Sequence, residues 1–178
     1  MISEKVQTIL NEQIKNELES YYIYLSMVSY FQSENLDGMA HWMRIQAHEE
    51  MMHAMKFFDH ISERGGTVTL LNLTQLKTTW KSPLEAWKNA CEHEKFITGK
   101  IHGIMKLIRK ENDYAAEPLV AWFVSEQIEE EANAEKILRQ MENIGDSKQG
   151  LFMLDRELAA RAFPTGSPLD PAAYNAAT

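Results

Sequence analysis

The sequence predicts an all-α protein: an antiparallel four-helix bundle with one long crossover between its second and third helices, followed by a short fifth helix. Three observations predict this fold. Apolar residues recur at three- and four-residue spacing through four long segments. Capping residues, glycines and prolines stand at the ends of these segments. Residues 67–81, between the second and third segments, lack that periodicity.

The first two helices have clear expected boundaries. The first is expected from about Ser3, a residue type that caps helix N-termini, to about Ser33. The second follows the turn ENLDG, with Asp37 as its candidate cap, and is expected to stop at the glycine pair 65–66. The next stretch, TVTLLNLTQLKTTWK, is expected to cross the surface in an extended form.

The last three helices are bounded in the same way. Ser82-Pro83 places a cap before a proline, which suits the first position of a helix, and KENDY ends this third helix. Pro118 lies near the start of the fourth helix, and Gly145 closes it. Ser147 is the candidate cap of the fifth helix, which is expected to reach about Ala162.

Composition sets the class of protein. One domain is predicted over residues 1–163, with a flexible C-terminal tail rich in Pro, Gly and Ala over residues 164–178. The formal net charge of −8 argues against nucleic acid as a partner and suits attraction of cations. The single Cys91 excludes an internal disulfide. With no apolar run long enough for a bilayer and no signal-peptide pattern, we expect a cytoplasmic protein without a membrane partner.

Polar residues interrupt the middle of each long apolar stripe. In chain order they are Glu17, Tyr24, Glu50, His53, Glu94, Gln127 and Glu130. Glu50 and His53 are three residues apart, so both side chains leave one face of the second helix, and the fourth-helix pair repeats that spacing. Because the middles of antiparallel helices meet at one level, these side chains are expected to converge at the bundle centre.

Convergence of four carboxylates needs compensation. Burying even one unpaired ion costs roughly several kcal/mol. Protonation is one solution, because burial raises carboxylate pKa values. Ion pairing is not, since no Lys or Arg lies on the central part of any stripe. Bound metal compensates better: oxygen ligands with one imidazole and no thiolate suit iron or manganese and admit zinc. The ligand count favours two metal ions, and a cluster of protonated carboxylates is the alternative.

The chain resembles a non-haem prokaryotic ferritin over nearly its whole length. The residues that carry the resemblance are Glu17 with Tyr24, EEMMH at 49–53, Glu94 and WFVSEQIEEE at 122–131. The resemblance implies a ferritin-like fold and an iron-storage function, in which Fe(II) is oxidised by dioxygen or peroxide at an intrasubunit di-iron ferroxidase centre. It also implies a homo-oligomer, a hollow shell of twenty-four subunits that holds Fe(III) as a mineral.

The resemblance assigns roles to individual residues. The implied ligands of the first iron are Glu17, Glu50 and His53. Those of the second are Glu50, as a bridge, Glu94 and Glu130. A third iron site typical of the bacterial group would use Glu49, Glu126 and Glu129. Beside the irons, Tyr24 would donate a hydrogen bond or an electron, and Gln127 would ligate weakly or hydrogen-bond bound oxygen.

Departures from related families limit the expectation. Bacterioferritins carry a second Glu-x-x-His on the fourth helix, where this chain has Gln127 and Glu130. Met51 stands where those proteins place a haem ligand, but methionine is also an ordinary helix residue, and haem is not expected. Two other functions stay open: a passive metal-binding shell, and a di-iron oxidase acting on an organic substrate. The latter needs an open cavity beside the irons, whereas bulky residues fill the stripes above and below.

Overall fold

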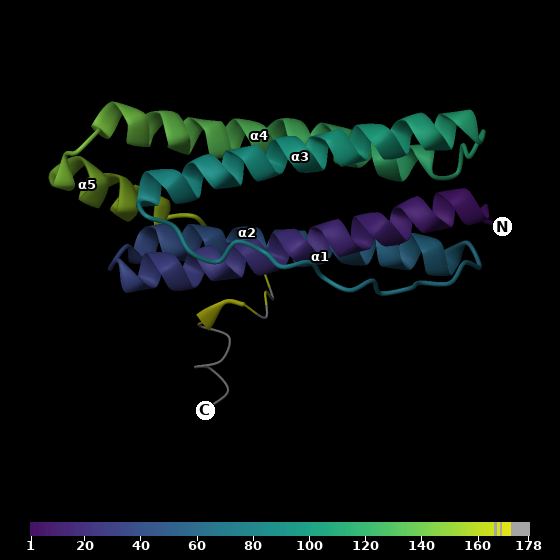
Figure 1. Cartoon of the computed structure of the whole chain (residues 1–178), viewed down its shortest axis with the longest axis horizontal. Coiled ribbons are helices and arrows are strands. Elements are labelled where there is room, and N and C mark those ends of the chain that lie inside the picture. The colour runs from purple at the N-terminus through teal and green to yellow at the C-terminus, as the bar shows by residue number, and fades with distance from the viewer. Residues whose placement is uncertain (166, 168, 172–178) are drawn as a thin grey trace.

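The computed structural model describes residues 1–165, 167 and 169–171. Within this part the chain forms helices and no strand, which confirms the predicted all-α fold. The helices are α1 (Glu4–Ser33), α2 (Asp37–Glu63), α3 (Pro83–Lys110), α4 (Glu117–Ile144) and α5 (Lys148–Leu158). Helices α1 and α2 form one layer, α3 and α4 form the other, and α5 crosses one end of the bundle (Figure 1).

Three of the predicted caps are confirmed. The side chains of Ser3, Ser82 and Ser147 accept hydrogen bonds from backbone N–H groups in the first turns of α1, α3 and α5. Such caps satisfy donors that have no partner inside the helix. Short polar residues at these positions therefore set where the three helices begin.

The predicted cap of α2 is wrong. Asp37 is the first helical residue, and Leu36 precedes it without a side-chain cap. The N-terminus of α2 is instead capped from another helix: the Asp155 carboxylate of α5 accepts a hydrogen bond of 2.8 Å from the Met39 N–H. A carboxylate at this end also interacts favourably with the helix dipole.

The crossover between α2 and α3 is extended, as predicted, and runs along α1 (Figure 1). Side chains of α1 hold it by accepting hydrogen bonds from its backbone. Asn11 accepts from the Thr69 N–H at 2.9 Å, and Glu19 accepts from the Thr74 N–H at 2.7 Å. The crossover therefore satisfies part of its backbone through α1 rather than through regular secondary structure.

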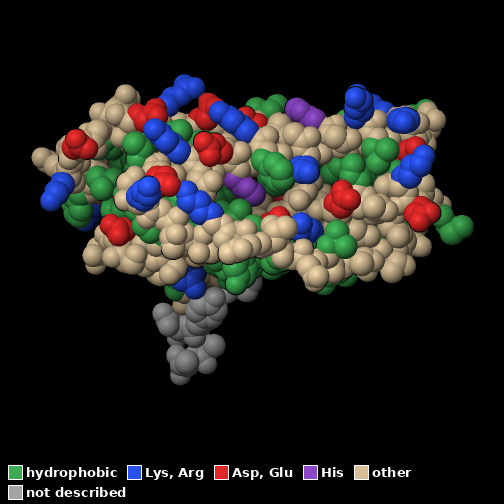
Figure 2. All heavy atoms as spheres, viewed as in Figure 1, with side chains coloured by type: hydrophobic (Ala, Val, Ile, Leu, Met, Phe, Trp, Pro, Cys, Tyr) green, Lys and Arg blue, Asp and Glu red, His purple; other side chains and the backbone are tan. Residues whose placement is uncertain are grey.

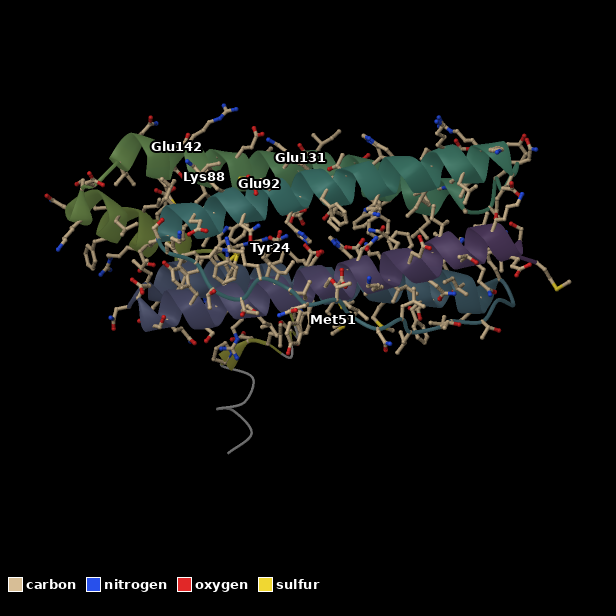
Figure 3. The ribbon with its side chains drawn as sticks, viewed as in Figure 1. Tyr24, Met51, Lys88, Glu92, Glu131 and Glu142 are labelled. Carbon is tan, nitrogen blue, oxygen red and sulfur yellow. The ribbon has the colours of Figure 1, made fainter. Side chains whose placement is uncertain are left out.

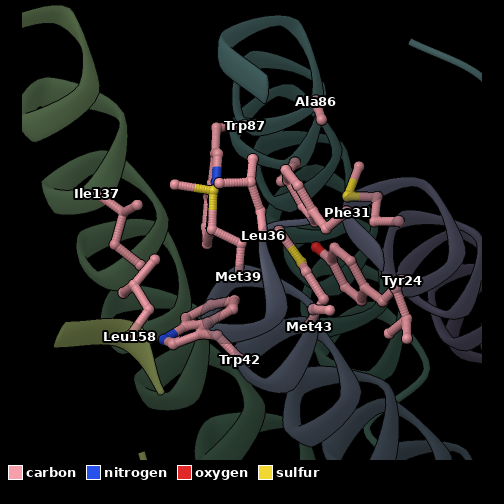
Figure 4. Close-up of a cluster of buried hydrophobic side chains, with 14 of the residues drawn as sticks. Tyr24, Phe31, Leu36, Met39, Trp42, Met43, Ala86, Trp87, Ile137 and Leu158 are labelled. Atoms are coloured by element: carbon pink, nitrogen blue, oxygen red, sulfur yellow. The ribbon is translucent and has the colours of Figure 1, made fainter. Parts of the chain in front are cut away.

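Two apolar clusters fill the bundle, one toward each end. In the cluster nearer α5, the rings of Trp42 and Trp87 meet edge to face at 5.0 Å, and Leu158 joins them from α5 (Figure 4). In the other cluster Phe57 stacks on Phe123 at 4.2 Å. The polar residues of the stripes lie between the clusters, as the sequence predicts.

The chain after α5 differs from the prediction. The helix ends at Leu158 rather than about Ala162, because the following residues tighten into a turn in which the Arg161 N–H bonds to the Leu158 carbonyl. The chain then returns to α2, where Phe163 meets the His41 ring at 5.0 Å. Ser167 is buried and Leu169 packs against the core. The division at residue 163 stays a prediction, and residues 166, 168 and 172–178 of the predicted tail lie outside the described part.

Acidic and basic side chains are interspersed over the face seen in Figure 2. Among the described helices, none combines the length and the apolar character needed to cross a bilayer.

Candidate metal centre

The first predicted ligand set comes together in the middle of the bundle. Glu17 of α1 and the pair Glu50 and His53 of α2 each offer a ligand atom, and these atoms lie within 4.8 Å of one another. All three residues are at least 95% buried. The three-residue spacing on α2 acts as predicted, because it turns the carboxylate and the imidazole toward one point facing α1.

The layer formed by α3 and α4 supplies the other predicted carboxylates of the centre. Glu94 of α3 accepts a hydrogen bond from the Tyr24 hydroxyl, which lies between the two layers (Figure 3). The Gln127 amide donates to Glu94 Oε2 at 3.3 Å. Glu130 is buried beside them and accepts a hydrogen bond from Gln46 at 2.7 Å. All four helices thus contribute a carboxylate to one buried centre.

Burial dominates the electrostatics of this centre. It raises the pKa of Glu17 to about 8 and the pKa of Glu94 to about 7, and neighbouring carboxylates add to the effect. Burial also raises the pKa values of Glu50 and Glu130. The raised pKa values favour the protonated form of these acids in the metal-free protein, and a bound cation would compete with such protons.

His53 is the only basic group among the predicted ligands. Burial alone would lower its pKa, but contacts with Glu126 and Glu50 raise it well above the usual range. Its Nδ1 lies 3.6 Å from Glu50 and its Nε2 lies 3.8 Å from Glu126. The raised pKa favours the protonated form of His53, and a protonated histidine must lose a proton to become a ligand.

One atom of the centre is suited to contact with a cation. Oε2 of Glu17 is buried and has no hydrogen-bond partner. Buried carboxylate oxygens are normally satisfied, and an orphan is costly unless an ion or a water meets it. The donor set consists of carboxylates, one imidazole and one amide, with no thiolate, which suits iron or manganese. The residues present therefore fit metal binding.

The residues of the predicted third site are only partly brought together. Ligand atoms of Glu126, Glu130 and His53 lie within 4.8 Å of one another. Glu49, however, is paired with Arg161, whose Nη2 lies 2.6 Å from its Oε2. Glu129 is exposed on α4. A metal ligated by Glu49 would have to displace this guanidinium, so the third site needs a rearrangement. Among the described residues, the second predicted set of Glu50, Glu94 and Glu130 does not bring three ligand atoms within 4.8 Å of one another, so it also needs its carboxylates to turn.

Sequence reasoning missed three residues at this centre. Gln13 donates to Glu17 at 2.8 Å, and Gln46 donates to Glu50 at 3.3 Å as well as to Glu130. Both glutamines stand four residues before a predicted ligand carboxylate on an otherwise apolar stripe, which was a usable signal. The sequence around Arg161 carries no pattern that would predict its contact with this centre, which it makes from beyond the end of α5.

A buried set of carboxylates and a Glu-x-x-His motif inside an antiparallel four-helix bundle is typical of carboxylate-rich metal-binding proteins. The sequence profile of the ferritin-like domain matches residues 7–144. The chain belongs to the ferritin family.

Curated relatives and solved structures agree with this assignment. The chain is 39% identical to a bacterial non-heme ferritin of Bacteroides fragilis, over 90% of this chain and 100% of that protein. It is 34% identical to one of Staphylococcus epidermidis, over 92% and 98%. An engineered closed form of the Archaeoglobus fulgidus ferritin superposes with a TM-score of 0.90 at 45% identity, over 92% and 100%. The open-pore ferritin of that archaeon gives 0.89 at 46%, over 91% and 100%.

The raised pKa values predict how pH affects the metal-free protein. Between pH 4.5 and about 8 the folded state holds a proton on Glu17 that the unfolded state has lost. The free energy of unfolding should therefore fall as pH rises through this window, by up to about 1.4 kcal/mol per pH unit for each such proton. Thermal unfolding of metal-free protein should show a lower midpoint at about pH 8 than at about pH 5.5.

Glu17→Gln is the control for this pH dependence. The amide does not titrate, so the fall in midpoint between the two pH values should become smaller. An unchanged fall would mean that Glu17 does not carry the shift.

Proposed function

We propose that this protein stores iron: it binds Fe(II) at the buried centre, oxidises it and retains Fe(III) as a mineral inside a homo-oligomeric shell. The single observation that carries the proposal is the buried, four-helix set of carboxylates around His53, with an unsatisfied oxygen on Glu17. Membership of the ferritin family supports storage, and relatives named bacterial non-heme ferritins support the non-haem branch.

The proposed first iron position is formed by Glu17, Glu50 and His53. The proposed second position is formed by Glu50 as a bridge, Glu94 and Glu130. Carboxylates favour Fe(III) over Fe(II), so this ligand set makes oxidation by dioxygen favourable. Two Fe(II) ions give one electron each, which together reduce dioxygen to the level of peroxide. Protons displaced from the buried acids when metal binds are available to that product.

Tyr24 and Gln127 act beside the ligands in this proposal. The Tyr24 hydroxyl donates to Glu94 and holds that carboxylate in place. Gln127 donates to the same carboxylate and is itself a weak neutral ligand at most. A third iron position at Glu49, Glu126 and Glu129, next to Glu130, is proposed as a transit site, filled only when Arg161 releases Glu49.

The shell is proposed to contain twenty-four subunits. Family membership and the superposition on Archaeoglobus fulgidus ferritins support a multimer. Dioxygen or peroxide is the proposed oxidant, and the proposed location is the cytoplasm.

Iron loading tests storage directly. Purified metal-free protein receives about a hundred Fe(II) ions per subunit in air and is then passed through a size-exclusion column. We expect ferric iron to co-elute with a large assembly, far in excess of two or three ions per subunit. Iron limited to those few ions, or precipitated outside the protein, would refute storage.

A di-iron oxidase acting on an organic substrate is the second candidate. It needs room for a substrate beside the metals. The apolar clusters that pack on both sides of the centre, including the stacked Phe57 and Phe123, disfavour such a cavity. A mineral core in the loading experiment would decide for storage.

A further inference from the structure

The chain beyond α5 places the positively charged side chain of Arg161 beside the metal centre. Arg161 contacts two side chains of α2 at once: its Nη1 donates to Gln46 Oε1 at 3.0 Å and its Nη2 donates to Glu49 Oε2 at 2.6 Å. Its guanidinium carbon also lies 4.3 Å from the centre of the Trp42 ring. About a fifth of its side chain remains exposed. The planar fork of an arginine can make both hydrogen bonds together, which a lysine ammonium does less well.

Arg161 determines which way the Gln46 amide faces. A guanidinium has only donors, so the amide oxygen of Gln46 must point toward it. The amide nitrogen then points to the opposite side, where it donates to Glu130 Oε2 at 2.7 Å and to Glu50 Oε1 at 3.3 Å. Gln46 is 1% exposed, so no alternative partner from solvent competes.

We propose that Arg161 is a positioning residue of the metal centre, acting through Gln46 on the carboxylates of Glu50 and Glu130. Both carboxylates belong to the proposed second iron position, so the inference rests on the proposed function. The amide holds one oxygen of each carboxylate and so limits the orientations in which the other oxygen meets a metal. The C-terminal segment thereby shapes the ligand geometry of α2 and α4.

Binding of Co(II) tests the inference without relying on iron oxidation. Co(II) is titrated into metal-free protein, and its visible absorption reports both affinity and ligand geometry. Arg161→Gln is expected to weaken binding by about 10- to 100-fold, the usual range for loss of a residue that orients a ligand, and to alter the spectrum. Gln46→Leu should have a similar effect, and the double variant should be no worse than Gln46→Leu alone.

Arg156→Gln is the matched control, because Arg156 is an exposed arginine of α5 whose guanidinium lies 6.0 Å from the Phe152 ring. It should bind Co(II) like the wild type. Equal or tighter binding by Arg161→Gln, with an unchanged spectrum, would overturn the inference even if its thermal midpoint falls. Additive losses in the double variant would overturn it too.

Glu50→Ala separates this inference from the proposed function. If Glu50→Ala binds Co(II) as the wild type does, the proposed centre itself is wrong. If Glu50→Ala loses binding while Arg161→Gln keeps it, only the role of Arg161 is wrong.

Discussion

Replacing Glu50 and His53 together by alanine should lower the initial rate of aerobic Fe(II) oxidation by about 100-fold or more. Loss of a group that merely orients a ligand costs about 10- to 100-fold, and this variant removes two ligands, one of them the proposed bridge. Both side chains are buried at the centre, and their ligand atoms lie near that of Glu17. The measurement is the rise of ferric absorbance after Fe(II) is added to metal-free protein.

Glu92→Ala is the control for this experiment, because Glu92 is an exposed glutamate of α3. It should oxidise Fe(II) at the wild-type rate. Circular dichroism of both variants establishes that the helices are intact. Equal, slow oxidation by the wild type and the double variant would mean that the centre is not catalytic. A passive shell, or a structural polar cluster, would then be the better interpretation.

The central site could be predicted because its signal is periodic. Glu17, Glu50 and Glu94 break apolar stripes at positions that antiparallel helices bring to one level. All three are buried in the structure, and ligand atoms of Glu17 and Glu50 lie within 4.8 Å of each other. Polar groups at core positions are costly, so their repetition on four helices is informative. Gln13 and Gln46, which donate hydrogen bonds to two of these carboxylates, interrupt the apolar stripes in the same way. Their signal was weaker, because a single amide on an apolar stripe does not by itself indicate a functional site.

Contacts made by α5 and the chain after it could not be predicted in this way. The cap of α2 comes from Asp155, and the partner of Glu49 is Arg161. Both contacts join residues more than a hundred positions apart, and no periodicity links them. Local propensity also failed at Asp37, a good capping residue by type, because the cap is supplied by tertiary structure.

Gly38→Ala should detach or displace α5. Gly38 lies in the first turn of α2, and a Cβ there would stand 1.7 Å from the backbone oxygen of Asp155. Backbone cannot rotate away as a side chain can, so α5 must move. We expect a loss of about 1–3 kcal/mol from overpacking and about 1 kcal/mol more from the lost cap on Met39. A lower thermal midpoint and faster hydrogen exchange in α5 would report this.

Gly99→Ala tests whether the effect of Gly38→Ala comes from the close contact with α5 or from replacing any helical glycine by alanine. Gly99 lies on an exposed face of α3, and no neighbouring atom lies within 4 Å of the position that a Cβ would take, so alanine there should stabilise the helix by about 0.5–1 kcal/mol. Opposite signs at the two glycines are therefore expected. If Gly38→Ala also raised the thermal midpoint and left α5 protected from hydrogen exchange, the packing of α5 would not require a glycine at position 38. Because α5 leads directly to Arg161, its displacement should also weaken Co(II) binding, which links the end of the bundle to its centre.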